Sequence, residues 1–167
     1  ILQKVQKRHK EELDKLEVEM NLEKTKVVDL KKGGSFSFLG FDFRLTRNRE
    51  GKAYVSKTPR KKKCIEIGKR VRAVLKANWN KPLKEVIQTV NATISGWVNY
   101  FRIGNSNSAF SKVRDYLEMK VRKFVLRRKK LKGFGWKRWS REEIYGKWGL
   151  YNDYRIRYVY PKANPGR

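Results

Sequence analysis

Residues 92–109 read ATISGWVNYFRIGNSNSA, and this stretch predicts the end of one amphipathic helix, a polar break and the start of another helix. Before the break, apolar side chains recur mostly every three or four residues, which is the spacing of one helix face; they are Leu83, Val86, Ile87, Val90, Ile94, Trp97, Val98 and Phe101. The break, residues 102–108, is rich in the glycine, asparagine and serine that form turns and cap helices. The aromatic end of the first helix either packs into a core or faces a nucleic acid, and the pattern alone leaves both interpretations open.

Two further helices are predicted beside this one. Residues 60–78 carry apolar side chains on one side, namely Cys64, Ile67, Val71, Val74 and Leu75. A helix over residues 108–131 carries apolar side chains at helical spacing, namely Val113, Leu117, Val121, Phe124 and Leu131. Three successive helices with short connections indicate a small antiparallel bundle. We expect one side of this bundle to carry a continuous positive surface.

The residues before the bundle predict a helix and a small sheet. Residues 1–20 have a loose apolar side, and residues 27–30 predict a strand. Glycine interrupts a run of alternating phenylalanines at Leu39-Gly40, which indicates a bulge or a tight turn. Residues 44–58 predict a hairpin with its turn near residues 48–52.

The residues after the bundle are aromatic and basic. Ser140 followed by Glu142 and Glu143 indicates a short capped helix, and alternation over residues 154–160 predicts one strand. The sequence therefore predicts an α+β fold: a β-hairpin and strand region, then a three-helix bundle, then a short α/β tail. We expect these three parts to span residues 1–56, 57–132 and 133–167.

The charge of the chain points to a polyanionic partner. Its 167 residues include 43 Lys and Arg against 16 Asp and Glu, a formal net charge of +27. A chain at that charge repels itself unless a polyanion neutralises it. Nucleic acid is the first candidate, because aromatic side chains between the cations can stack on bases. An anionic membrane surface is disfavoured, since the apolar faces pair within a bundle, and no run approaches the length of a membrane span.

Cysteine and histidine each occur once, as Cys64 and His9. No disulfide framework and no zinc site can be built from one of each. Cys64 lies on the apolar side of its helix and is interpreted as a core residue, whereas His9 is interpreted as solvated. This composition fits a reducing, intracellular compartment, and we expect a cytoplasmic, bacterial location. The chain opens on Ile1 in what reads as mid-helix, so we expect a fragment.

Candidate nucleic-acid contacts lie in two helical windows. Residues 57–76 contain 9 basic and 1 acidic residue, and residues 112–138 contain 12 basic and 2 acidic residues. Cations on a rigid helical face suit the phosphates and 2′-hydroxyl groups of an A-form duplex. Trp97 and Phe101 are interpreted as core residues. The candidate contacts are Arg60, Lys61, Lys62, Lys63, Lys69, Arg70, Arg72, Tyr100, Arg102, Arg122, Lys123, Lys129, Lys130, Trp136, Lys137, Arg138 and Trp139.

Three separate motifs carry a resemblance to a known family. NLEKTKVV at residues 21–28 and FSFLGFDF at residues 36–43 resemble the last two sequence blocks of the reverse transcriptase palm. Residues 96–128, GWVNYFRIGNSNSAFSKVRDYLEMKVRKFVLRR, resemble the thumb or maturase domain of group II intron-encoded reverse transcriptases. The order and spacing of the motifs also match. The resemblance is therefore to the C-terminal portion of such an enzyme: end of palm, thumb and basic tail.

The resemblance implies roles for individual residues. Lys24 matches a palm lysine near the growing end of the duplex, and Phe38, Leu39 and Gly40 match the primer-grip turn. The bundle matches the thumb, which closes on the template–product RNA–DNA duplex and also holds intron RNA during splicing. The implied partners are intron RNA, that duplex, and the N-terminal fingers and palm.

The catalytic aspartates of the family do not appear in the sequence. They bind the metal ions for nucleotidyl transfer and are expected upstream of Ile1, so no catalytic or metal-binding residue is assigned. No cofactor is expected for this chain alone, and Mg²⁺ is expected only in the complete polymerase. We therefore expect RNA and RNA–DNA duplex binding without polymerisation. The alternatives are a stand-alone maturase-type RNA-binding protein and a basic structural protein of an RNP.

Overall fold

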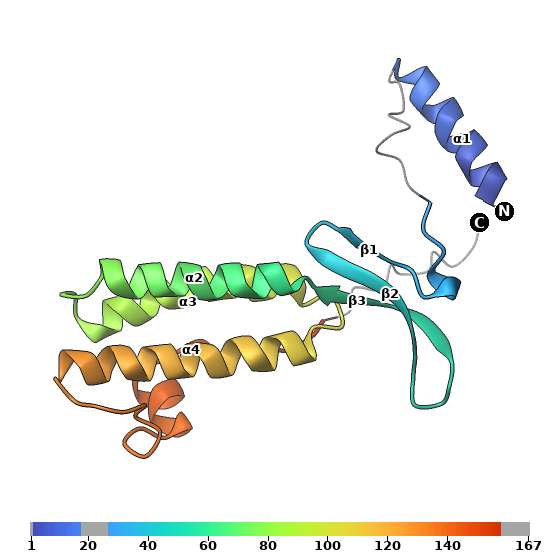
Figure 1. Ribbon diagram of the computed structural model, residues 1–167. Helices are drawn as coiled ribbons and strands as arrows, with labels where there is room; N and C mark the ends of the chain where they lie inside the picture. The colour runs from blue at the N-terminus through green and yellow to red at the C-terminus, as the bar shows by residue number, and fades with distance from the viewer. Residues whose placement is uncertain (1, 18–26, 158–167) are drawn as a thin grey trace, which may run out of the picture.

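The computed structural model describes residues 2–17 and 27–157, and Figure 1 shows how they are arranged. A three-stranded antiparallel sheet is followed by helices that pack together, which confirms the predicted α+β fold. The elements in chain order are α1 (Leu2–Lys15), η1 (Leu30–Lys32), β1 (Ser35–Phe38), β2 (Phe41–Arg47), β3 (Ala53–Pro59), α2 (Lys61–Ala77), α3 (Leu83–Phe101), α4 (Asn107–Arg128) and η2 (Glu143–Lys147).

The sheet is a meander in the order β1-β2-β3. Phe38 pairs with Phe41, so only Leu39 and Gly40 connect β1 to β2. Both connecting residues have positive φ, 47° for Leu39 and 79° for Gly40. This backbone matches the right-handed twist of the flanking strands in a two-residue hairpin. The interruption predicted at Gly40 is therefore a tight turn.

The predicted hairpin between β2 and β3 is confirmed. Asn48 Oδ1 accepts hydrogen bonds from the backbone N–H groups of Glu50 and Lys52, at 3.0 and 2.8 Å. At the other end of β3, the N–H of Arg60 donates to the Gly40 carbonyl at 2.9 Å. Only Arg60 separates β3 from α2, so this hydrogen bond joins the β1–β2 turn to the start of the bundle.

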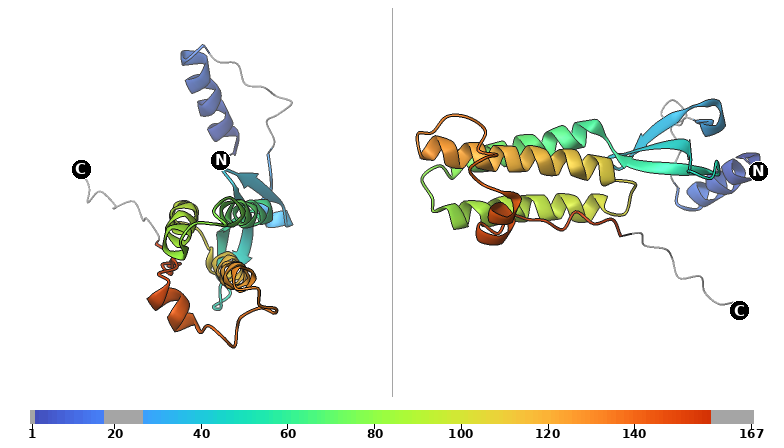
Figure 2. Two further views of the ribbon diagram at one scale, coloured as in Figure 1. Left: turned by 90° about the vertical axis from the view of Figure 1, so that its left-hand side faces the viewer. Right: turned by 90° about the horizontal axis from the view of Figure 1, so that it is seen from below.

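α2, α3 and α4 form the predicted bundle, and α3 runs opposite to its two neighbours (Figure 2). Each helix begins and ends within three residues of its prediction. Their apolar stripes meet in one core that includes fully buried valine and isoleucine side chains. Burying each such side chain contributes about 1.5–3 kcal/mol, and this packing holds the three helices together.

The polar break after α3 fixes the sheet against the bundle. The N–H of Asn105 donates to the Lys57 carbonyl at 2.6 Å, and the N–H of Lys57 donates to Asn105 Oδ1 at 3.0 Å. A Cβ on Gly104 would lie 2.6 Å from that same Lys57 carbonyl oxygen, so the close approach requires glycine. Phe41 of β2 then packs edge-on against Phe101, with ring centroids 4.9 Å apart.

The tail extends the core and lies along the bundle (Figure 2). Ile144 and Leu150 are buried in the same cluster as the three helices. The predicted helix cap is confirmed as a capping box. The N–H of Glu143 donates to Ser140 Oγ, and the N–H of Ser140 donates to the Glu143 carboxylate, both at 3.2 Å. The following residues form the π-helical turn η2.

Two predicted strands are absent from the described residues. Residues 27–29 are irregular, because the Asp29 side chain accepts from the Lys31 N–H at 2.8 Å and caps the 3-10 turn η1 instead. Residues 154–157 are also irregular, and residues 158–160 of that prediction lie outside the described part of the chain. The helix predicted over residues 1–20 is α1, which ends at Lys15.

Candidate nucleic-acid interface

α2 forms a basic ridge between two grooves. Its buried residues, Ile67, Gly68, Val71 and Leu75, lie on one side of the helix. The step of 100° per residue spreads the cations over the remaining sector. All are exposed except Lys63, which is half-buried. These predicted contact residues, here called the α2 ridge, are Lys61, Lys62, Lys63, Lys69, Arg70 and Arg72.

Seven cations line the groove between α2 and α4. It has two parts of about 330 and 310 Å³, and Arg72 lines both. Within the described residues, no Asp or Glu side chain lines either part. The cations that line it, here called the α2–α4 cation groove, are Lys61, Arg72, Lys76, Lys112, Lys120, Lys123 and Arg127.

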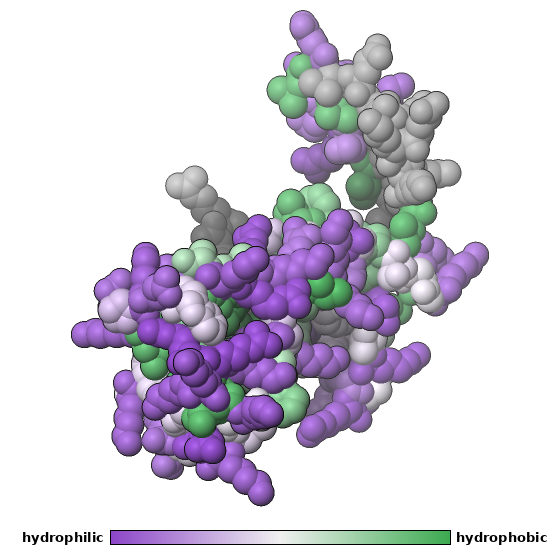
Figure 3. All heavy atoms as spheres, turned by 60° about the vertical axis from the view of Figure 1, so that its left-hand side comes forward, coloured by the Kyte–Doolittle hydropathy of each residue, from purple (hydrophilic) through white to green (hydrophobic). Residues whose placement is uncertain are grey.

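Close packing of α2 on α4 brings these cations together. A Cβ on Gly68 would lie only 3.0 Å from Cε1 of Tyr116, so the glycine allows the two helices to approach. Lys120 Nζ lies 5.2 Å from the centroid of the Tyr116 ring, within cation–π range. Figure 3 views the bundle from the end remote from the sheet, and hydrophilic side chains dominate that view.

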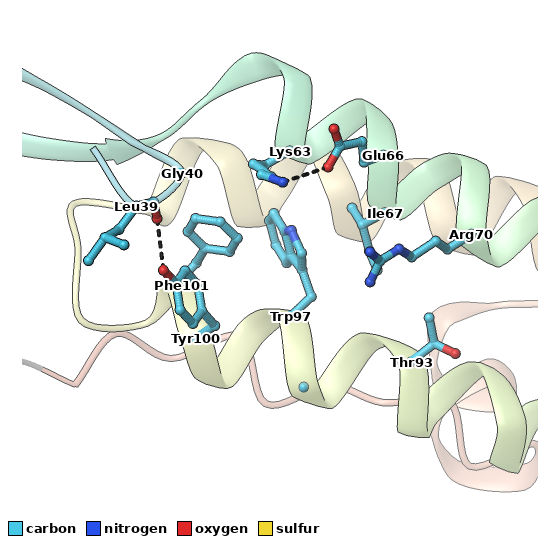
Figure 4. Close-up of a pocket in the computed structure, with 11 residues that line it drawn as sticks. Leu39, Gly40, Lys63, Glu66, Ile67, Arg70, Thr93, Trp97, Tyr100 and Phe101 are labelled. Atoms are coloured by element: carbon cyan, nitrogen blue, oxygen red, sulfur yellow. Dashed lines mark hydrogen bonds and ion pairs between the residues drawn. The ribbon is translucent and has the colours of Figure 1, made fainter. Parts of the chain in front are cut away.

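The groove between α2 and α3 has a different character and opens beside the β1–β2 turn (Figure 4). Its volume is about 500 Å³, and Trp97 and Tyr100 lie on its α3 side. The Tyr100 hydroxyl donates to the Leu39 carbonyl at 2.8 Å and so holds the turn against α3. Lys63 Nζ lies 2.9 Å from the Glu66 carboxylate, so this groove contains a paired cation.

The residues matched to the primer-grip turn form an exposed apolar tip next to this groove. Phe38 and Leu39 are 60% and 65% exposed, whereas Gly40 is half-buried. A Cβ on Gly40 would meet Lys63 and Phe101 at 3.5 Å. Lys24, which the resemblance places near the growing duplex end, lies outside the described residues.

Arg122 was predicted to contact nucleic acid, and that prediction is wrong because its side chain is buried. Its exposed fraction is 1%, and its guanidinium donates to the Glu118 carboxylate at 3.2 Å and to the Trp139 carbonyl at 3.1 Å. The tail covers this side of α4, which the helix pattern assigned to solvent. Arg141 and Tyr145 of the tail also donate to Glu118, at 3.0 and 2.6 Å.

This cluster keeps a carboxylate ionised inside the protein. Burial raises the pKa of Glu118, but the hydrogen bonds from Tyr145, Arg141 and Arg122 outweigh burial and leave the pKa below its ordinary value. Burial and the hydrogen bond to Glu118 raise the pKa of Tyr145, so its hydroxyl stays protonated and donates. The cluster therefore serves to join the tail to α4.

Arg102 was also predicted to contact nucleic acid, and it too is buried, with 7% of the residue exposed. Its guanidinium donates to the Asp153 carboxylate at 3.2 Å and to the Tyr151 hydroxyl at 3.0 Å. Burial raises the pKa of Asp153, but the bonds from Arg102 and the charge of Arg157 bring it below its ordinary value. Arg102 thus secures the tail to the end of α3.

The four predicted tail contacts differ in exposure. Lys137 and Arg138 are exposed. Trp136 is 47% exposed, but the Arg122 guanidinium lies 4.0 Å from its ring centroid and occupies one face. Trp139 is half-buried and packs edge-on against Trp148 at 5.3 Å. Trp139 is therefore a packing residue in this structure.

The remaining predicted contacts lie at the ends of the bundle. Arg60 is exposed, and its Nε lies 3.5 Å from Asp42 of β2. Lys129 and Lys130 are exposed just after α4. Phe101 is buried and Trp97 packs against the core, which confirms that interpretation for both.

Sequence reasoning missed four cations of the α2–α4 cation groove, together with the indole at its far end. The four cations are Lys76, Lys112, Lys120 and Arg127, and the indole is Trp79. The sequence did contain a pattern that indicates them. Polar side chains at residues 112, 116, 120, 123 and 127 are spaced by four and three residues, which places them as a stripe on one face of a helix. The contact between α2 and α4 that turns this stripe into a groove was not visible in the sequence.

Residues 66–146 match the protein family described as "Group II intron, maturase-specific domain". The chain contains a group II intron maturase-specific domain. The match begins in α2, includes α3 and α4, and ends in η2, so this maturase-specific domain contains most of the α2–α4 cation groove. Such a domain implies an RNA-binding role in intron splicing. No curated protein matches the sequence.

None of the described helices is long and apolar enough to cross a membrane. Residues 2–17 and 27–157 hold no group of three or more His, Cys, Asp or Glu side chains that could bind a metal ion.

Proposed function

We propose that this chain binds RNA and RNA–DNA duplexes through the α2–α4 cation groove and the α2 ridge, as the thumb part of a group II intron-type reverse transcriptase. The observation that supports this most is the convergence of seven cations within or beside the maturase-specific domain, in a groove that no carboxylate of the described residues lines. Cations on rigid helices contact phosphates at any sequence, which is what an enzyme that moves along a duplex needs.

The dimensions of the groove suit a nucleic-acid backbone. Lys61 and Lys76 are fifteen residues apart on one helix, which corresponds to roughly 22 Å at a rise of about 1.5 Å per residue. A duplex carries about one phosphate charge per 1.7 Å of its axis. Several phosphates can therefore lie along the groove at once.

The sheet supports the polymerase part of this proposal. The β1–β2 turn presents Phe38 and Leu39 to solvent, and Tyr100 holds the turn beside the groove between α2 and α3. A fixed apolar tip next to a duplex-binding surface suits the primer grip that the FLG motif implies. The fingers and palm of such an enzyme would then be partners of this chain.

A stand-alone maturase is the second candidate. It is favoured by the position of the family match, which covers most of the bundle and part of the tail but not the sheet. Both candidates bind intron RNA, and they differ in whether the β1–β2 turn contacts a primer.

The experiment is equilibrium binding of this chain to a folded group II intron RNA and to an unrelated structured RNA of equal length, over a salt series. The salt slope reports the number of phosphates contacted. We expect tighter binding to the intron RNA, with a preference that persists at high salt. Equal affinity for both RNAs at every salt concentration would contradict the intron-specific part of the proposal.

A variant tests the surface in the same assay. Replacing Lys61, Lys62 and Lys63 by Glu is expected to weaken binding to both RNAs alike and to flatten the salt slope. Unchanged affinity would contradict the placement of the interface on this side of α2.

A further inference from the structure

The end of the α2–α4 cation groove remote from the sheet combines positive charge with an aromatic ring. This part has a volume of about 310 Å³, at the lower end of the range for pockets that take small ligands, about 300–1,000 Å³. Besides Leu75 and Phe124, its lining consists of Trp79 and five cations, namely Arg72, Lys76, Lys120, Lys123 and Arg127. The proposed contacts to a continuous duplex backbone do not need an indole here.

Trp79 is held in place but remains accessible. It lies in the connection between α2 and α3, is 42% exposed, and packs edge-to-face with the buried Phe124 at 5.4 Å and 85°. Within the described part of the chain, no lysine or arginine lies over its ring. Trp136, the other exposed tryptophan, differs, because the Arg122 guanidinium lies over it at 4.0 Å. Trp79 thus offers a rigid aromatic surface to a ligand.

The neighbouring cations are available in different degrees. Lys123 Nζ lies 3.9 Å from the Phe134 ring centroid and is partly engaged there. Lys120 contacts the half-buried Tyr116 ring at 5.2 Å. The described residues provide no salt bridge to Arg72, Lys76 or Arg127, and these three side chains are exposed. The pocket therefore has an aromatic surface and unneutralised cations close together.

A nucleotide has the matching chemistry, because its base stacks on aromatic rings and its phosphate binds cations. In a continuous duplex each base is covered by its neighbours, so its face cannot reach an indole. Resting on the proposed function, we propose that this pocket binds one unpaired nucleotide of the RNA, with its base on Trp79 and its phosphates on Lys76, Arg72 and Arg127. The pocket would let a groove that binds any duplex recognise a bulge or a frayed end.

The test uses a short blunt RNA duplex, the same duplex with one bulged adenosine, and the same duplex with an abasic residue in the bulge. Equilibrium binding is measured for the wild-type chain, for Trp79→Leu and for the matched control Trp136→Leu. We expect the wild type to bind the adenosine bulge roughly tenfold more tightly than the abasic bulge, because only the adenosine has a base that can stack on an aromatic ring. This ratio is expected to fall to about one in Trp79→Leu and to persist in Trp136→Leu.

Trp79→Phe is the control for loss of folding, because it keeps an aromatic ring packed against Phe124. This variant is expected to bind the blunt duplex as the wild type does and to retain part of the bulge preference. Equal binding of adenosine and abasic bulges by the wild type, or a ratio unchanged in Trp79→Leu, would overturn the inference. The proposed function would instead be overturned if the wild type did not bind the blunt duplex, or bound it with an affinity that does not fall steeply with salt.

Discussion

Arg122 donates a hydrogen bond to the Glu118 carboxylate at 3.2 Å, four residues earlier on α4, and both side chains are almost completely buried. The same carboxylate accepts from Arg141 and Tyr145 of the tail. One acidic side chain thus receives three donors from two segments. It joins α4 to the tail and leaves the opposite sector of α4 free to face the α2–α4 cation groove.

Replacing Glu118 is expected to destabilise the fold strongly. Glu118→Gln leaves the buried Arg122 charge without a counter-charge, and removing one partner of a buried pair costs about 3–5 kcal/mol. At about 2–4 °C per kcal/mol for a chain of this size, the melting temperature falls by roughly 6–20 °C. The measurement is thermal unfolding followed by circular dichroism.

Asp115→Asn is the matched control for Glu118→Gln. Asp115 also accepts from Arg141, at 2.9 Å, but it is exposed. Exposed pairs contribute about 0–1 kcal/mol, so this variant is expected to melt close to the wild type. Equal loss of stability in the two variants would contradict a role that depends on burial.

The stabilisation from Glu118 is expected to disappear in acid. Its pKa is lower in the folded chain than the ordinary value of 4.5, so the unfolded chain binds the proton first as the pH falls. The contribution is complete above pH 4.5 and is lost as the pH falls through the folded pKa. The difference in unfolding free energy between wild type and Glu118→Gln, measured with urea at several pH values, should shrink below pH 4.5. A difference that stays constant down to pH 3 would count against the ionised cluster.

The contact between Gly68 and Tyr116 is expected to reduce the stability that the chain gains when alanine replaces Gly68 in α2. Gly→Ala in a helix usually stabilises by about 0.5–1 kcal/mol. Gly96→Ala on α3 should gain this, because a Cβ there meets nothing within 4 Å. Gly68→Ala should gain less or lose stability, since the Tyr116 ring must move. Chemical denaturation measures both variants.

A double-mutant cycle separates this contact from helix propensity. In a Tyr116→Ala background, Gly68→Ala is expected to recover the gain that Gly96→Ala shows. If Gly68→Ala behaves the same with and without the Tyr116 ring, the close approach of α2 to α4 is not what the glycine provides.

Leu39 is expected to be a strained turn residue. Its φ of 47° is unfavourable for a branched side chain, by about 1–2 kcal/mol, and little apolar area is lost on replacing it because it is largely exposed. Leu39→Asn creates the Asn-Gly pair that such turns prefer and should stabilise the chain by about 1 kcal/mol in chemical denaturation. A loss of stability would indicate that the leucine side chain packs more than its exposure indicates.

Local sequence patterns predicted the helices and the hairpin turn more accurately than they predicted the residues of the nucleic-acid interface. The apolar steps of α2, α3 and α4 and the glycine at the β1–β2 turn could be read directly, because helix and hairpin geometry depend on nearby residues. Arg122 was misassigned because its partner Trp139 is seventeen residues away, and residues 131–139, which lead to that partner, form no helix. Residues 27–29 have a strand-like composition, but the Asp29 side chain satisfies the backbone in a turn.

The position of the interface also depended on long-range packing. The stripe on α4 that includes Lys112, Lys120 and Arg127 was present in the sequence, but a stripe becomes a groove only where another helix lies beside it. Gly68 sets that distance, and nothing in the neighbouring residues indicates which helix it meets. Arg102 was misassigned for the same reason, since its partner Asp153 belongs to the tail.

The most direct test of the α2–α4 cation groove is the salt dependence of binding to a blunt RNA duplex. The variant Arg72→Gln, Lys76→Gln, Lys120→Gln removes three charges from the groove, and Lys4→Gln, Lys7→Gln, Lys10→Gln removes three from the exposed side chains of α1 as a control. The account predicts weaker binding and a salt slope reduced by about three for the groove variant, with the control close to wild type. A slope that is unchanged in the groove variant, or reduced equally in both, would contradict the placement of the RNA in this groove.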